Sequence, residues 1–176
     1  MEITIILILI VLHGFLVLGE IALITAKRAK LESEKAKGNR NAAIAVGLLD
    51  NIDNYLSAMQ IGITLISIVE GAYGGVAIGA QLAPVVALVP AFAPYADQIS
   101  ISVVVTVITY LSLVVGELAP KYIAIQHAES LAMTFAPVME LITRVTGPIS
   151  SFLSWSTKLF MRMLLLNPSP EQNISE

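Results

Sequence analysis

The sequence contains no cysteine and has few charged residues for its length. Only 13% of its 176 residues are Asp, Glu, Lys or Arg, whereas 56% are hydrophobic. Soluble domains carry about 25% charged residues. The lack of cysteine excludes disulfides, thiolate metal sites and thiol catalysis. The shortage of charge places the chain among membrane proteins.

Basic residues are absent from a long central stretch. Six of the ten Lys and Arg residues lie between Lys27 and Arg40, and none lies between Arg40 and Lys121. Short loops rich in Lys and Arg remain in the cytoplasm. With three spans, this asymmetry predicts an N-terminus outside the cell and a C-terminus in the cytoplasm.

Three apolar runs are long enough to cross a bilayer, which takes about 20 residues. They cover about 3–25, 55–80 and 99–119, and they make 1–130 a predicted three-span transmembrane domain. The first run lacks the basic start and cleavage site of a signal peptide, so we expect it to be retained. Prolines between the second and third runs oppose a spanning helix there and favour an external connection.

Residues 131–166 are apolar but interrupted by prolines and charges. A fourth span would bury Glu140 and Arg144, at about 2.5–3.5 kcal/mol for each charge. We therefore predict short amphipathic helices at the cytoplasmic interface, anchored by Trp155. Residues 167–176 are expected to begin a linker. The predicted fold is an all-α integral membrane protein with three transmembrane helices plus short juxtamembrane cytoplasmic helices.

Two of the predicted spans carry stripes of small and polar residues at helical spacing, which places each stripe on one helix face. In lipid such groups turn toward protein partners or a water-filled path. Hydrogen bonding between helices and an ion pathway both remain open. The stripes comprise Ser57, Gln60, Thr64, Ser67 and Gly71 in the second span, and Ser102, Thr106, Thr109, Ser112 and Gly116 in the third.

The third predicted span ends with a carboxylate next to a proline. Pro120 cannot donate a hydrogen bond to the carbonyl of Gly116, four residues back. That carbonyl would lie free beside Glu117, and hard cations such as Mg²⁺ prefer oxygen ligands of this kind. The alternative is an interfacial ion pair between Glu117 and Lys121 at i+4.

Further titratable groups lie in the first two spans. Glu20 follows Gly19 near the cytoplasmic end of the first span, with Lys27 as an alternative partner, and His13 lies one heptad earlier on the same face. We interpret His13 as a packed, hydrogen-bonded side chain. Glu70 borders the polar stripe of the second span, toward the expected outer end of the pathway. Two roles remain open for it: a neutral, hydrogen-bonded side chain or a functional group.

The second predicted span also carries glycines at a spacing of four, at positions 71, 75 and 79. Small residues at this spacing allow helices to approach closely. We interpret them as a packing surface between spans or protomers.

Signals of enzymatic chemistry and nucleic-acid binding are lacking. The sequence has no HExxH, GxSxG or P-loop motif, and its one short basic loop is explained by topology. We therefore expect a protein that is not an enzyme and binds no nucleic acid.

Three segments in order, GEIALITAKRAKLE, NYLSAMQIGITLIS and VVGELAPKYIAIQ, resemble the CorC/HlyC and cyclin-M (CNNM) family of magnesium transport proteins. The resemblance covers about residues 10–130 and weakens toward the end. It implies a homodimer in the cell membrane (inner or plasma), in contact with lipid. It also implies a cytoplasmic region with CBS-type nucleotide-binding domains beyond these 176 residues.

The resemblance further implies a Mg²⁺ site between the spans near the cytoplasmic side. Two departures bear on it, because many members have Ser where this chain has Gly19 and an Asn pair where it has Ile63-Thr64. The family ligands correspond here to Gly19, Glu20, Ser57, Thr64, Gly116 and Glu117.

The leading hypothesis is a Mg²⁺ transporter, with export as the expected direction and Na⁺ as a candidate coupling ion. One alternative is an exporter of another divalent cation or of a polyamine. The other is a non-transporting membrane anchor and dimerisation module.

Overall fold

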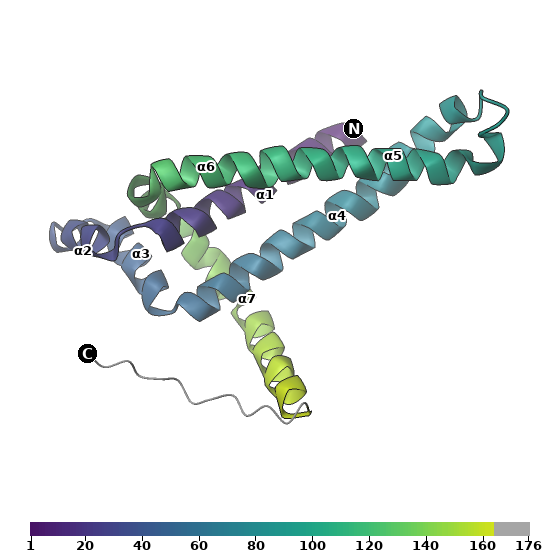
Figure 1. The fold of residues 1–176 in the computed structure, drawn as a ribbon. Coiled ribbons are helices and arrows are strands. Elements are labelled where there is room, and N and C mark those ends of the chain that lie inside the picture. Colours follow the sequence, from purple (N-terminus) through teal and green to yellow (C-terminus); the bar gives the residue numbers. More distant parts are fainter. Residues whose placement is uncertain (164–176) are drawn as a thin grey trace.

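The computed structural model describes residues 1–163, and all of their regular structure is helical. Three helices are long and apolar enough to cross a membrane, and they run side by side in Figure 1. The predicted all-α fold with three spans is thereby confirmed. The first two are α1 (Glu2–Thr25) and α4 (Ile52–Val86), and the third joins α5 (Ala96–Leu111), the π-helical η2 (Ser112–Leu118) and α6 (Ala119–Gln126).

The helix of the second span extends beyond its predicted end near residue 80. It continues through Pro84 to Val86. A proline two residues before the last residue of a helix removes one hydrogen bond without ending the helix. The connection to α5 contains a 3₁₀ turn, η1 (Ala93–Tyr95), at the end of the molecule opposite the two short helices that follow the first span (Figure 1).

The sequence predicted that the third span ends next to Pro120, but its helix does not end there. It continues through α6 to Gln126, and Pro120 is buried in the first turn of α6. The preceding segment, η2, is π-helical, with hydrogen bonds that reach five residues back instead of four. Together they replace the predicted stop with a locally widened, continuous helix.

Two short helices, α2 (Arg28–Ala36) and α3 (Arg40–Asp50), follow the first span. Gly38 between them has φ +88°, a conformation that favours glycine. The Asn39 side chain accepts hydrogen bonds from the amides of Asn41 and Ala42 at 3.0 and 3.2 Å, which caps α3. The chain therefore turns between the two helices at Gly38-Asn39.

In place of several short helices over 131–166, the structure has one long helix, α7 (Ala128–Met163). Pro137 and Pro148 lie inside it. Each proline removes a single backbone bond, and α7 packs against α1, α3 and α4. In Figure 1, α7 crosses the direction of the three long helices. The predicted linker at 167–176 lies outside the described residues.

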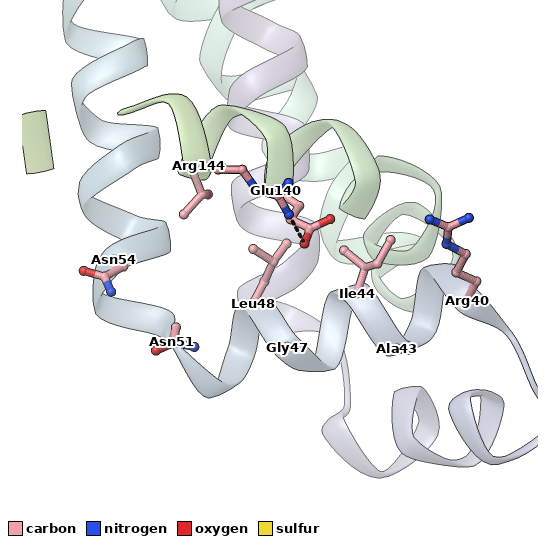
Figure 2. A pocket seen from close by; sticks show the side chains of 10 residues that line it. Arg40, Ala43, Ile44, Gly47, Leu48, Asn51, Asn54, Glu140 and Arg144 are labelled. Atoms are coloured by element: carbon pink, nitrogen blue, oxygen red, sulfur yellow. Dashed lines mark hydrogen bonds and ion pairs between the residues drawn. The ribbon is translucent and has the colours of Figure 1, made fainter. Parts of the chain in front are cut away.

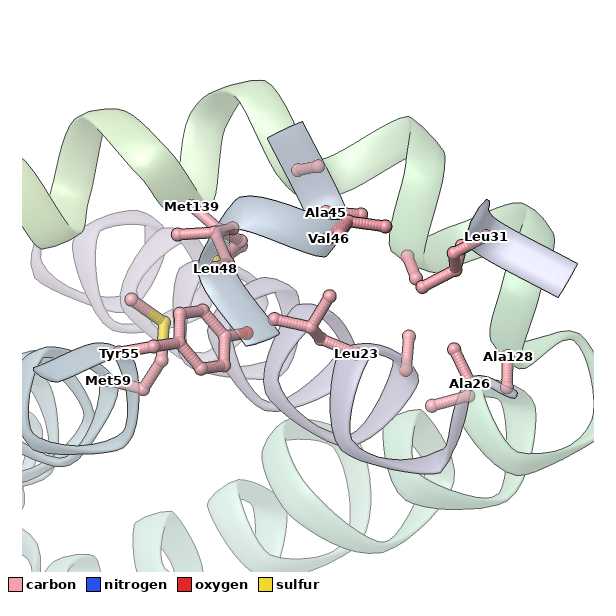
Figure 3. Close-up of a cluster of buried hydrophobic side chains, with 14 of the residues drawn as sticks. Leu23, Ala26, Leu31, Ala45, Val46, Leu48, Tyr55, Met59, Ala128 and Met139 are labelled. Atoms are coloured by element: carbon pink, nitrogen blue, oxygen red, sulfur yellow. The ribbon is translucent and has the colours of Figure 1, made fainter. Parts of the chain in front are cut away.

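The main hydrophobic core lies at one end of the molecule, where α1, α2, α3, α4 and α7 meet (Figure 3). Leu31 and Tyr55 are fully buried there, and Met139 is buried from α7. Truncating a buried Leu or Met to Ala costs about 2–5 kcal/mol, so this cluster is a strong tie between α7 and the spans.

The glycines of α4 allow close packing against α5, but not at all three predicted positions. A Cβ at Gly79 would lie 2.9 Å from Ile101 Cγ1 and 3.3 Å from Ile101 Cα. One at Gly75 would lie 2.9 Å from a methyl group of Val105, whereas one at Gly71 would have no neighbour within 4 Å. The helices therefore pack through Gly75 and Gly79.

We expect Gly79→Ala to lower the thermal midpoint of the detergent-purified protein, because the new methyl group meets the backbone of Ile101. Overpacking of this kind costs about 1–3 kcal/mol. Gly71→Ala is the matched control and should leave the midpoint unchanged or raise it, since alanine favours the helix. Equal midpoints for the two variants would contradict close packing at Gly79.

Candidate functional site

Two carboxylates from different spans line one cavity of about 340 Å³. Glu20 comes from α1 and Glu117 from η2, and both are half-buried. Gln60 and Ser67 of α4 add an amide and a hydroxyl, and Lys121 of α6 adds an ammonium group. The cavity thus gathers oxygen ligands from all three spans, close to the end of α1 that leads into α2.

The Glu117 carboxylate already has a cationic partner. Lys121 Nζ donates to Glu117 Oε1 at 2.5 Å, and the two side chains are 40% and 35% exposed. This is the i+4 ion pair that the sequence offered as an alternative to a metal site. Within the described residues Glu20 forms no ion pair. The cavity therefore holds one carboxylate that is paired and one that is available.

The remaining predicted ligands lie apart from this cavity. A Cβ at Gly19 would lie 2.5 Å from Met139 Cε, so this residue faces α7. Thr64 is exposed and accepts a hydrogen bond from Gln60 Nε2 at 3.1 Å, and Ser57 is half-buried one turn before Gln60. The structure brings Glu20 and Glu117 together, but does not place Gly19, Ser57 or Thr64 on the cavity wall.

Gly116 lies where η2 packs closely against α1. A Cβ at Gly116 would lie 3.2 Å from His13 Nδ1. A Cβ at Gly14 would lie 3.1 Å from Pro120 Cγ, 3.1 Å from the Val115 carbonyl oxygen and 3.5 Å from Gly116 Cα. The absence of side chains at Gly14 and Gly116 lets the π-helical segment lie directly on α1, which brings Glu117 near Glu20.

A second cavity of about 160 Å³ adjoins the first, and both are lined by His13, Ser67 and Glu117. Its deepest group is Glu70, whose side chain is 2% exposed. Ser112 Oγ donates to Glu70 Oε2 at 2.6 Å, and His13 Nδ1 lies 3.6 Å from the same oxygen. Glu70 lies midway along α4, rather than toward an outer mouth.

The contact between His13, Glu70 and Ser112 was missed by reasoning from the sequence. The sequence showed His13 and Glu70 as separate polar residues and Ser112 as one member of a stripe. One signal was available: a carboxylate in the apolar middle of a span requires a partner on a facing helix. His13 and Ser112 occupy the middle of the other two spans and were the natural candidates.

A larger groove of about 600 Å³ lies between α3, the start of α4 and α7 (Figure 2). Arg144 Nη2 donates to Glu140 Oε1 at 3.2 Å, and Arg40 lies at the far end of the groove. Among the described residues, no side-chain nitrogen or oxygen atom in this wall is both buried and unpartnered. We therefore place the candidate site at the two cavities between the spans.

The carboxylates are not arranged as a compact metal cage. Among residues 1–163, no three His, Asp or Glu side chains lie close enough together to hold one metal ion. A cation bound by Glu20 and Glu117 would therefore keep part of its water shell, as Mg²⁺ usually does in proteins.

The fold and the cavities define an all-α membrane protein with an intramembrane polar site. The chain matches the family described as the cyclin M transmembrane N-terminal domain over residues 4–176, and it belongs to that family. This confirms the resemblance stated from the three segments.

Two bacterial relatives share most of the chain. It is 43% identical over 176 residues to the UPF0053 protein sll0260 of Synechocystis, covering 100% of the chain and 39% of the relative. It is 35% identical over 166 residues to the UPF0053 protein YhdT of Bacillus subtilis, covering 94% and 36%. The chain therefore spans less than two fifths of the length of these relatives.

We expect Gly14→Ala to loosen the site, because its methyl group would meet the carbonyl of Val115, which is fixed backbone. The thermal midpoint in detergent should fall, by the equivalent of about 1–3 kcal/mol. Gly62→Ala is the control, since its methyl group would meet only the flexible end of Leu16. A Gly14→Ala variant as stable as Gly62→Ala would contradict the close approach of η2 to α1 at Gly14.

Proposed function

We propose that this chain forms the ion pathway of a Mg²⁺ transporter, with Glu20 and Glu117 as the charged groups that hold the ion. The observation that carries the proposal is the shared cavity, in which carboxylates from α1 and η2 face an amide and a hydroxyl of α4. The ion moves without chemical change, so the proposed role is transport rather than catalysis.

The cavity has the size and ligand chemistry for a hydrated divalent cation. Mg²⁺ is commonly bound through one or two carboxylates while it retains several waters. Six waters occupy about 180 Å³ at about 30 Å³ each, which fits inside the cavity of about 340 Å³. Two carboxylates also match the charge of one divalent ion, which matters where water is scarce.

Lys121 is proposed to act as an internal competitor for the same carboxylate. Its ammonium group contacts Glu117 on the cavity wall, where a bound cation would also contact it. Both side chains are partly exposed, so the pair can separate at low cost. Entry of Mg²⁺ would displace Lys121 and leave Glu20 and Glu117 both facing the ion.

We also propose the orientation and assembly that the sequence implies. The N-terminus lies outside and the basic α2 lies in the cytoplasm of a cell bounded by the inner or plasma membrane. A second copy covers the exposed polar face of α4 and α5, which includes Thr64, Thr106 and Thr109 and would otherwise meet lipid. The proposal also includes CBS-type domains, export as the direction of transport and Na⁺ as the coupling ion. These three parts rest on the family resemblance alone.

The proposal is tested with full-length protein carrying Glu117→Gln, which removes the charge and keeps the shape. For wild type, Mg²⁺ at about 100 times its dissociation constant should stabilise the folded state by about 2.7 kcal/mol. In Glu117→Gln this stabilisation should be lost, and Mg²⁺ flux in proteoliposomes should fall to background. Folded Glu117→Gln protein with wild-type flux would contradict the proposal.

The matched control is Glu140→Gln. Glu140 forms an i+4 pair with Arg144, as Glu117 does with Lys121, but lies on α7 outside the three spans. It should retain Mg²⁺ stabilisation and flux. The same assay addresses the alternatives: displacement of Mg²⁺ by spermidine would favour a polyamine, and a wild type that moves no cation would favour a membrane anchor.

For Lys121→Gln we expect the opposite effect, a higher affinity for Mg²⁺. Removing the competing ammonium group should lower the apparent dissociation constant for Mg²⁺, by about 3- to 10-fold for a pair worth about 1 kcal/mol. The measurement is a Mg²⁺ titration of the thermal midpoint, with Lys30→Gln as a control on α2. A weaker affinity in Lys121→Gln would show that the lysine supports the site instead of competing for it.

A further inference from the structure

We propose that the groove between α3, the start of α4 and α7 binds the headgroup of an anionic phospholipid (Figure 2). In this proposal the lipid phosphate lies between Arg40 and Arg144, and the acyl chains contact exposed apolar side chains of α7. The groove is separate from the two cavities between the spans, because no residue lines both. The inference therefore does not depend on which ion the chain transports.

The groove lies where the chain enters the second span. The helix α4 begins at Ile52 and is long and apolar enough to cross a bilayer, and Asn51 and Asn54 at its start line the groove. In Figure 1, α7 crosses the direction of the spans beside the start of α4. Headgroups occupy the layer on either side of the hydrocarbon core, so a groove at the start of a span is within their reach.

The wall of the groove has a net positive charge. Two arginines, Arg40 and Arg144, share it with one carboxylate, Glu140. The nearby Asp50 is off the wall and paired with Arg28 at 2.6 Å. Guanidinium groups bind phosphate through paired hydrogen bonds, and basic pockets beside spanning helices bind anionic headgroups. A lipid with one negative charge would therefore neutralise the wall.

Both arginines are available to a phosphate. Arg40 is exposed and forms no ion pair with any residue that the structure describes. Arg144 Nη2 donates to Glu140 Oε1 at 3.2 Å, but these side chains are 75% and 43% exposed. An exposed i+4 pair contributes little to stability, so the Arg144 guanidinium can turn toward a phosphate at low cost.

The order of polar groups along the groove matches that in a glycerophospholipid. Figure 2 shows Arg40 at one end, Asn51 and Asn54 at the other, and the pair of Arg144 with Glu140 between them. Amide groups donate hydrogen bonds and suit the ester oxygens of the lipid. The esters carry the acyl chains and lie on the membrane side of the phosphate, as the two asparagines lie at the start of the span.

Gly47 leaves open space on the α3 side of the groove. A Cβ at this position would meet no atom within 4 Å, and the glycine lies in the interior of α3. Glycine is less favourable than alanine within a helix, and neither close packing nor a positive φ requires it here. A large side chain at position 47 would therefore take up space that a headgroup needs.

An apolar surface of α7 distinguishes a lipid from a soluble phosphate compound. Leu141 and Val145 are exposed, and Leu141 precedes Arg144 by three residues and Val145 by four. Side chains at these spacings are neighbours on the surface of a helix. Exposed apolar side chains on a helix that crosses the spans are typical of one lying in the membrane interface. Acyl chains can thus contact α7 while the headgroup occupies the groove.

The test measures the thermal midpoint of full-length protein in detergent, in Mg²⁺-free buffer with chelator, titrated with phosphatidylglycerol against phosphatidylcholine of the same acyl chains. Phosphatidylglycerol should stabilise wild type and phosphatidylcholine should not. In the double variant Arg40→Gln/Arg144→Gln, the apparent dissociation constant for phosphatidylglycerol should rise about 5-fold for each arginine removed. An equal response of wild type to the two lipids would overturn the proposal.

The matched control is the double variant Lys35→Gln/Lys37→Gln. It removes the same charge from exposed positions at the C-terminal end of α2, off the groove wall. It should bind phosphatidylglycerol as wild type does. An equal loss of affinity in the two double variants would show diffuse attraction to the basic segment and would contradict a site in the groove.

A variant that retains both arginines keeps the test valid if the arginine variant fails to fold. Gly47→Phe should abolish the stabilisation by phosphatidylglycerol, because the ring fills the groove, whereas Gly47→Ala should retain it. A Gly47→Phe response equal to that of Gly47→Ala would place the lipid elsewhere and reject the proposal.

A final comparison separates a lipid from other occupants of the groove. Glycerol phosphate, which lacks acyl chains, should stabilise wild type less than phosphatidylglycerol at the same concentration. Equal stabilisation would identify a soluble phosphate ligand and exclude the lipid. A full-length wild type that responds to neither compound would show that another segment of the chain or a second copy covers the groove, and this too would overturn the proposal.

Discussion

The arrangement of the three spans depends on a buried carboxyl group that needs polar partners from the neighbouring helices. Glu70 is buried midway along α4, where its carboxyl group requires partners on the facing helices. Its contacts with Ser112 of η2 and His13 of α1 bring the three spans together at one depth. Glu20 lies one heptad after His13 on α1, and Glu117 lies shortly after Ser112. Both line the interface between the three spans. The two cavities follow one another along this interface.

The close approach of α1 and η2 is the second requirement. Gly14 and Gly116 face each other with no side chain between them, and Pro120 packs against the same glycine of α1. Proline would normally end or kink a helix. Here the π-helical segment before it preserves continuity and turns Glu117 toward Glu20. Such segments interrupt the regular helix at some energetic cost and are frequent at functional sites, which agrees with its position beside the cavity.

Local features were predictable from the sequence, whereas contacts between distant helices were not. The three spans and the proximity of Glu117 to Lys121 each depend on residues within a few positions of one another. By contrast, Gly19 faces Met139, 120 positions later in the chain, and nothing near Gly19 indicates it. The π-helical segment is a second reason why the positions of the site residues could not be predicted from the sequence. Each residue of an α-helix turns the face by about 100°, so a wider turn at Ser112–Leu118 shifts every later side chain from its extrapolated position.

The position of Glu117 constrains any cation that would bind under the function proposed for this site. Its carboxylate borders both cavities and already accepts a hydrogen bond from Lys121. A cation held by Glu20 and Glu117 would compete with that ammonium group, and an ion pair between partly exposed side chains separates at low cost. When the cation leaves, Lys121 would again compensate the charge of Glu117, so that this carboxylate would have a cationic partner whether or not an ion is bound.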